Sequence, residues 1–165
     1  SIDQILYNVP GRTAVDMSVD TTSRLSEISN IIGIKDATGD LSVIKELVAK
    51  CPEDFLLLTG DDATAIDFLL LGGHGGISVT ANVTPRELQK AYLAAIAGNT
   101  ELAKKLNEGL SGLHKNLFIE SNPIPVKWAL HKMGKCDSGI RLPLLKLSSE
   151  WRTVVENDLK GLNLI

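Results

Sequence analysis

Lys35 and Tyr7 are the residues of this chain whose types and positions best fit a chemical role. Lys35 ends a β-prone apolar run that begins at Ile31, and Tyr7 lies near the end of an earlier run over residues 4–8. If the two runs are neighbouring parallel strands, the amine and the phenol share the edge where parallel α/β folds bind ligands. A neutral amine attacks carbonyl groups to form a Schiff base, and a phenol can carry protons for that reaction. The pair therefore predicts imine chemistry.

Each candidate also has an ordinary structural explanation. A lysine at a strand end can extend into solvent, and Tyr7 can be a half-buried strand residue with its hydroxyl in water. Apolar neighbours would favour the neutral, nucleophilic form of Lys35. Arg12 follows Pro10 and Gly11, so its guanidinium either clamps a substrate carboxylate above the sheet edge or is a surface arginine. The shared edge favours the chemical interpretation of all three side chains.

Other polar groups are interpreted as structural. The glycine-rich segment 72–76 lacks the order of a dinucleotide-binding loop and enters a strand, so it predicts a tight turn. Asp61 and Asp62 have no third ligand nearby and favour helix capping over a metal site. The histidines have no partner spacing and are interpreted as ordinary structural residues (His74, His114 and His131).

The elements that would position these residues repeat in a regular order. Strands are predicted over residues 4–8, 31–35, 55–59 and 76–79, each followed by an amphipathic helix. Such βα units indicate a parallel sheet, and the nearly continuous apolar strands are typical of a sheet covered on both faces. Helix starts are predicted at Ser18, at Asp40, at Asp61 or Asp62, and at Thr84-Pro85. The inner faces include Leu25 and Ile28, and then Ile44, Leu47 and Val48.

After Gly98 the pattern becomes wholly helical. Helices are predicted over residues 100–118, 123–133 and 147–159, with no strand beyond Val79. The expected domains are residues 1–98, holding four βα units, and residues 99–165, holding a helical appendage. A closed barrel needs eight such units and about 250 residues. The four units, and a start at Ser1 that runs directly into a strand, therefore predict part of a longer protein.

Composition excludes several classes of function. The 165 residues carry a formal net charge of −3 and 4% aromatic residues, which argues against a nucleic-acid-binding surface. The apolar stretches are far shorter than the roughly 20 residues of a membrane-spanning helix. Cys51 and Cys136 match no metal or redox spacing, so we expect reduced thiols in a cytoplasmic protein.

Several segments together resemble the dihydrodipicolinate synthase family. These are LYNVPGRT over residues 6–13, IGIKDATG over residues 32–39, TGDD over residues 59–62, GHGGISV over residues 73–79 and NPIPVK over residues 122–127. The resemblance covers essentially the whole chain. It implies an α/β TIM (β/α)8 barrel, of which this chain holds the last four βα units plus a C-terminal helical appendage.

The resemblance implies a lyase that condenses pyruvate with L-aspartate 4-semialdehyde in lysine and diaminopimelate biosynthesis, without a metal or organic cofactor. Lys35 matches the Schiff-base lysine, Tyr7 the proton-relay tyrosine, and Arg12 the arginine that meets the semialdehyde carboxylate. Gly60 and Ile77 match positions whose backbone lines the pyruvate pocket. A homo-oligomer, either tetramer or dimer, is also implied.

Some family features have no counterpart in this chain. The threonine pair near an early strand and the tyrosine borrowed across a subunit interface are absent, so we expect weak or no activity from the chain alone. Two alternatives follow. One is another 2-oxo-acid aldolase, such as N-acetylneuraminate lyase, although the Gly-Arg-Thr sequence at residues 11–13 favours the synthase. The other is a non-catalytic half-barrel that serves as a structural subunit.

Overall fold

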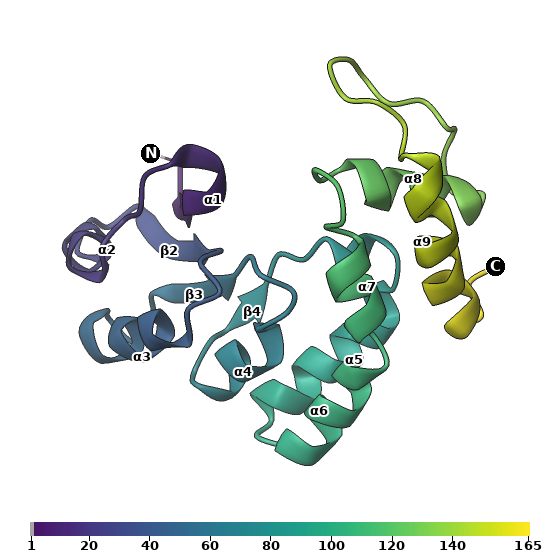
Figure 1. Cartoon of the computed structure of the whole chain (residues 1–165). Helices are drawn as coiled ribbons and strands as arrows, with labels where there is room; N and C mark the ends of the chain where they lie inside the picture. The colour runs from purple at the N-terminus through teal and green to yellow at the C-terminus, as the bar shows by residue number, and fades with distance from the viewer. Residues whose placement is uncertain (1) are drawn as a thin grey trace. The chain divides into compact units, whose positions relative to one another are not determined.

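The computed structural model describes residues 2–165 of the chain. Four strands form one parallel sheet in the order β1-β2-β3-β4 (Figure 1). The strands are β1 (Gln4–Asn8), β2 (Ile31–Asp36), β3 (Leu56–Thr59) and β4 (Gly75–Gly76). The predicted succession of parallel βα units is therefore confirmed.

Helices follow every strand and make up the rest of the regular structure. They are α1 (Pro10–Thr13), α2 (Val19–Ser26), α3 (Leu41–Lys50), α4 (Ala65–Leu70), the 3₁₀ helix η1 (Thr80–Asn82), α5 (Pro85–Ile96), α6 (Thr100–Glu108), α7 (Ser111–Asn116), α8 (Ile124–Lys132) and α9 (Ser149–Gly161). No helix among the described residues is long and apolar enough to cross a membrane.

The predicted helix starts at Ser18 and Asp40 are confirmed. The Ser18 hydroxyl accepts a hydrogen bond from the Thr21 amide at 3.2 Å, and the Asp40 carboxylate accepts one from the Ser42 amide at 2.8 Å. Each bond satisfies a helix-end N–H group that has no partner within the helix. The predicted helix start at Asp61 or Asp62 is wrong, because α4 begins at Ala65 with Thr64 as its N-cap. The Asp61 carboxylate instead accepts hydrogen bonds from the amide and the hydroxyl of Thr64, in the turn that precedes α4.

One face of the sheet packs against helices α2, α3 and α4, which lie along the same side of the strands in Figure 1. Its core contains Ile34 and Leu57 from the strands together with Ile44 and Leu47 from α3. Two residues predicted for the inner faces are instead exposed. Ile28 lies beyond the end of α2, and Val48 lies at the border of the buried stripe of α3.

The opposite face of the sheet is open within residues 2–165. Because side chains alternate along a strand, this face carries Ile5, Tyr7 and Leu56, which are 44%, 49% and 37% exposed. The expectation that both faces are covered is therefore not met by the described part of the chain. The open face is also the one that carries Lys35, two residues after Gly33 in β2.

Strand β4 is shorter than the predicted range 76–79. The Ile77 amide still donates to the Thr59 carbonyl at 2.8 Å, but the chain then turns toward η1. The prediction was wrong because it rested on the β-branched Ile77 and Val79. Such preferences reflect packing against neighbours, and Ile77 is 50% exposed.

Contacts divide the chain into two compact units. Unit 1 holds the residues up to Ser78 together with Lys90–Lys104, and unit 2 holds Val79–Gln89 together with Lys105–Ile165. Helix α5 runs through the boundary between them. The domain division at residue 98 stays a prediction.

The core of unit 2 is formed by side chains from α7, α8 and α9, from the segment before α9, and from the residue that follows η1. Its buried members are Val83, Leu113, Leu117, Val126, Ala129, Leu147, Val155 and Leu159. The predicted single helix over residues 100–118 is wrong, because α6 ends at Glu108 and α7 begins at Ser111. Gly109 weakens the helix at this point, and the turn buries Leu110.

Candidate active site

Lys35 and Tyr7 lie side by side on the open face of the sheet. They are register partners in the parallel pairing of β1 with β2. The Lys35 ammonium nitrogen is 4.1 Å from the centroid of the Tyr7 ring, a distance at which the negative face of an aromatic ring attracts a cation. The predicted meeting of an amine and a phenol is therefore confirmed, and both groups are accessible to a small carbonyl compound.

Gly60 leaves space for the Lys35 side chain. It follows β3, and its amide donates to the Asp36 carbonyl at 2.6 Å. A Cβ atom at Gly60 would lie 2.6 Å from Lys35 Cε and 2.9 Å from the Ala37 Cβ. Carbon atoms do not approach so closely in proteins, so the backbone at Gly60 forms one wall of the space that Lys35 occupies.

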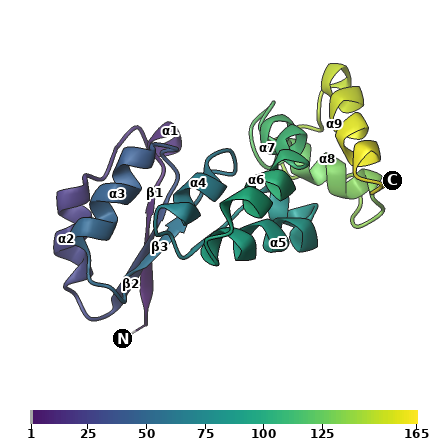
Figure 2. The ribbon, with the colours of Figure 1, turned by 90° about the horizontal axis from the view of Figure 1, so that it is seen from below.

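The other two candidates are at the ends of neighbouring elements. Ile77 follows β4 directly, and the hydrogen bond from its amide to the Thr59 carbonyl keeps it at the same edge of the sheet. Arg12 belongs to the short helix α1, which begins two residues after β1 ends, and its side chain is exposed. Figure 2 shows β1 running up to α1 at this edge. The roles of Arg12 and Ile77 stay predictions.

A row of buried polar residues supports the edge from the other face of the sheet. Asn8, Asp36 and Thr59 are register neighbours on β1, β2 and β3, and each is at most 4% exposed. The Asn8 amide nitrogen donates to Asp36 at 3.1 Å and to Asp16 at 2.9 Å. Asn8 and Asp36 directly follow Tyr7 and Lys35, so this bond links the two strands next to the Lys35–Tyr7 pair.

Sequence reasoning assigned no role to Asn8 or Asp36. The signal that could have identified them is the strand alternation itself. A polar residue that directly follows a reactive one at a strand end faces the covered side, where an unpaired polar group is costly. The side-chain oxygen Oδ1 of Asn8 also accepts from the Met17 amide, and the Asp36 carboxylate accepts from the Thr38 amide, both at 3.1 Å. The two side chains therefore fix the loops that follow β1 and β2.

A second phenol in the same unit has a different character. Burial and the negative charges of Asp62 and Asp61 raise the pKa of Tyr92 well above its ordinary value. The Tyr92 hydroxyl lies against Gly76, where a Cβ atom would come within 2.7 Å of it. A phenol that stays neutral in this way is a packing element, so Tyr7 is the better candidate for a proton carrier.

The histidines and acidic residues show structural contacts. His74 Nδ1 accepts from the Leu57 amide at 2.9 Å, which ties the glycine-rich turn to β3 as predicted. His114 is buried between Thr80 and Asn107, with ring contacts of 2.9 and 3.0 Å. Within residues 2–165, no group of three or more His, Cys, Asp or Glu residues could hold a metal ion. Both cysteines are free.

Comparison with known proteins extends over nearly the whole chain. The model of the dihydrodipicolinate synthetase family matches residues 1–162. The 4-hydroxy-tetrahydrodipicolinate synthase of Ruthia magnifica is 61% identical over 164 residues, which is 99% of this chain and 55% of that protein. The protein of the same name from Pseudomonas aeruginosa is 59% identical over 148 residues, or 90% of this chain and 51% of its own length.

Solved structures give the same result. A crystal structure of the chloride-inhibited dihydrodipicolinate synthase of Acinetobacter baumannii complexed with pyruvate matches with a TM-score of 0.96 and 52% identity. The enzyme of Aquifex aeolicus matches with a TM-score of 0.96 and 41% identity. The chain covers 56% of each, so it spans about half the length of the relatives it matches. Its four-stranded parallel sheet is part of a TIM (β/α)8 barrel, and the chain belongs to the dihydrodipicolinate synthetase family.

Proposed function

We propose that this chain carries the imine-forming part of a 4-hydroxy-tetrahydrodipicolinate synthase, a lyase of lysine and diaminopimelate biosynthesis. The observation that carries the proposal is the 4.1 Å contact between the Lys35 amine and the Tyr7 ring at the carboxyl edge of the sheet. The relatives that bear this name support the choice of substrates, pyruvate and L-aspartate 4-semialdehyde. Because the chain spans about half of their length, the activity belongs to the full-length enzyme.

In the proposed reaction the nitrogen of Lys35 attacks the ketone carbon of pyruvate, and loss of water gives an imine. Loss of a methyl proton converts the imine to an enamine, whose carbon adds to the aldehyde of the second substrate. The amino group of that substrate then attacks the imine carbon, closes the ring and releases Lys35. Tyr7, beside the reacting nitrogen, transfers protons during imine formation and breakdown. The lysine itself supplies the electron sink, so the mechanism needs no organic cofactor.

Three other residues have proposed binding roles. Arg12 would bind the carboxylate of the semialdehyde through its guanidinium, which suits bidentate pairing. The backbone at Gly60 and Ile77 would line the pyruvate pocket. The support for Gly60 is its close approach to Lys35, and the support for Ile77 is its place at the same edge.

We also propose that the full-length protein is a homo-oligomer, either a tetramer or a dimer, in the cytoplasm. The large apolar side chains Leu93, Ile96 and Leu102 are exposed in unit 1, as expected for a surface that a second copy covers. One solved relative is described as a monomeric variant, so the assembly varies within the family. Light scattering of the purified protein gives its mass directly.

Borohydride trapping tests the catalytic proposal. Incubation of the full-length protein with pyruvate and borohydride is expected to reduce the imine and leave a stable adduct on Lys35, located by peptide mass mapping. Lys35→Met is expected to abolish the adduct. Tyr7→Phe is expected to keep it on Lys35 but to slow its formation by about 10²–10⁴-fold, the usual contribution of a general acid or base.

Lys45→Met is the matched control, because Lys45 is exposed on α3 and should not affect trapping. An adduct on a different lysine, or none on Lys35, would overturn the proposal. Turnover with aspartate semialdehyde, compared with cleavage of N-acetylneuraminate, separates the synthase from another 2-oxo-acid aldolase.

A further inference from the structure

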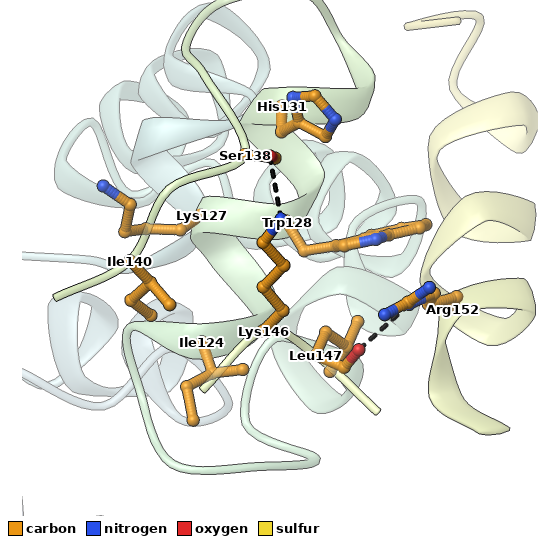
Figure 3. Close-up of a pocket in the computed structure, with 9 residues that line it drawn as sticks. All are labelled: Ile124, Lys127, Trp128, His131, Ser138, Ile140, Lys146, Leu147 and Arg152. Carbon is orange, nitrogen blue, oxygen red and sulfur yellow. Dashed lines mark hydrogen bonds between the residues drawn. The ribbon is translucent and has the colours of Figure 1, made fainter. Parts of the chain in front are cut away.

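Unit 2 contains a cavity of about 220 Å³ that the proposed imine chemistry does not use. It lies between α8 and the segment that leads into α9, and Figure 3 shows the side chains that line it. Its apolar lining includes Ile124, Trp128 and Ile140. The volume is smaller than the roughly 300–1,000 Å³ typical of sites for drug-sized ligands, so it suits a small molecule.

The charged lining of this cavity is entirely basic. Lys127, Lys146 and Arg152 line it, and no aspartate or glutamate does. None of the three forms an ion pair within residues 2–165. In contrast, the neighbouring Lys132 and Lys160 both pair with Glu156, at 3.5 and 2.9 Å. Positive charge without a carboxylate partner is therefore concentrated around the cavity.

Hydrogen bonds hold the cationic groups and the cavity wall in place. The Lys146 amine donates to the Ser138 hydroxyl at 3.1 Å, and Arg152 Nε donates to the Leu147 carbonyl at 2.9 Å, as the dashed lines in Figure 3 mark. The terminal nitrogens of the Arg152 guanidinium make no hydrogen bond to another described residue, and they are the donors that suit a carboxylate. His131 Nδ1 contacts the Cys136 carbonyl at 3.2 Å and helps to fix the start of the wall segment.

We infer that this cavity is a binding site for a small aromatic or heteroaromatic carboxylate. Trp128 and the two isoleucines would contact the flat apolar part of the ligand, and Arg152 and Lys146 would bind its carboxylate. The tryptophan explains the preference for a planar ligand, because an aromatic ring gains from stacking as well as from burial. The absence of acidic lining explains the preference for an anion. The inference does not depend on the proposed imine chemistry.

The two tryptophans of the chain make a local test possible. Trp151→Phe leaves Trp128, which lines the cavity, as the only tryptophan of the 165-residue chain, and the chain itself is the protein titrated. Titration of this variant with benzene-1,3-dicarboxylate at constant ionic strength is expected to quench its emission to a plateau. The uncharged benzene-1,3-dicarboxamide is expected to cause no saturable change. Quenching without a plateau, or equal quenching by the diamide, would overturn the inference without any further variant.

Single charge removals in the same background test the cationic groups. Lys146→Met and Arg152→Met are each expected to raise the midpoint of the titration by about tenfold or more, the size of one lost charge-assisted bond. Lys160→Met is the matched control, because Lys160 pairs with Glu156 and does not line the cavity. An equal effect of Lys160→Met would mean that overall charge, and not the cavity, determines binding. Unchanged midpoints in both cavity variants would also contradict the inference.

Discussion

At the scale of single residues, Gly60 determines where the Lys35 amine can lie. The Gly60→Ala change places a Cβ atom 2.6 Å from Lys35 Cε and 2.9 Å from the Ala37 Cβ, so both the lysine side chain and the loop at Ala37 must shift. We expect the rate of pyruvate–borohydride trapping on Lys35 to fall by about tenfold or more, because small misplacements of a reacting group have large effects on rate. Peptide mass mapping at timed intervals measures the rate.

A matched glycine controls for the alanine substitution itself. A Cβ atom at Gly139 would meet no other atom within 4 Å, so Gly139→Ala should trap pyruvate at the rate of the unchanged protein. If Gly60→Ala also traps at that rate, the close approach of Gly60 does not control the position of the amine.

The sequence was most informative about these single residues. Lys35 and Tyr7 could be paired from it because strand ends in a parallel sheet lie at a common edge. The cationic contact between them depends on side-chain torsions, which no sequence pattern specifies. Strand alternation places Asn8 and Asp36 on the covered face, but no local pattern reveals the hydrogen bond between them, which joins residues 28 positions apart in the chain.

At the scale of elements, the Asn8–Asp36 hydrogen bond connects β1 to β2 beneath the reactive pair. Asn8→Ala would leave the buried Asp36 carboxylate without this donor. We expect the free energy of unfolding to fall by about 1–3 kcal/mol, the cost of an unsatisfied buried polar group. Urea denaturation followed by circular dichroism measures the change.

Asn30→Ala provides the comparison for that measurement. The side-chain amide of Asn30 donates to the Ile2 carbonyl at an exposed position. Loss of this hydrogen bond should change the free energy of unfolding by at most about 0.5 kcal/mol. Similar losses for Asn8→Ala and Asn30→Ala would show that burial does not increase the importance of the Asn8 bond.

Element boundaries were predictable where a local signal existed. Ser18 and Asp40 bond to helix-end amides and Pro85 opens α5, so these starts follow from neighbouring residues alone. The break at Gly109 was missed because a single glycine is tolerated in many helices, and the burial of Leu110 in the fold decides the outcome. The end of β4 likewise depends on what lies beside Ile77.

At the scale of the whole molecule, the largely buried phenol of Tyr92 couples stability to alkaline pH. The folded protein raises its pKa above the unfolded value near 10. The folded state therefore favours the neutral phenol. Its contribution to the free energy of unfolding is present below about pH 10 and is lost as the pH rises from there. Tyr92→Phe removes the ionisable group. We expect the stability of the variant, relative to the unchanged protein, to improve between pH 8 and pH 11.

Urea unfolding of both proteins at the two pH values measures this relative change. All other titrating groups are common to the two proteins, so their contributions cancel in the difference. A difference that is the same at both pH values would contradict the role assigned to the buried phenol.

The alternation of side chains along β1 and β2 has a consequence for how such a protein can diversify. Tyr7 and Lys35 occupy one face, while Asn8 and Asp36, their immediate neighbours in sequence, hold the strands together from the other. Mutations that reshape the open face, at Ile5 or Leu56, therefore leave the supporting bonds intact. New substrate preferences can accumulate there during evolution while the reactive amine keeps its position.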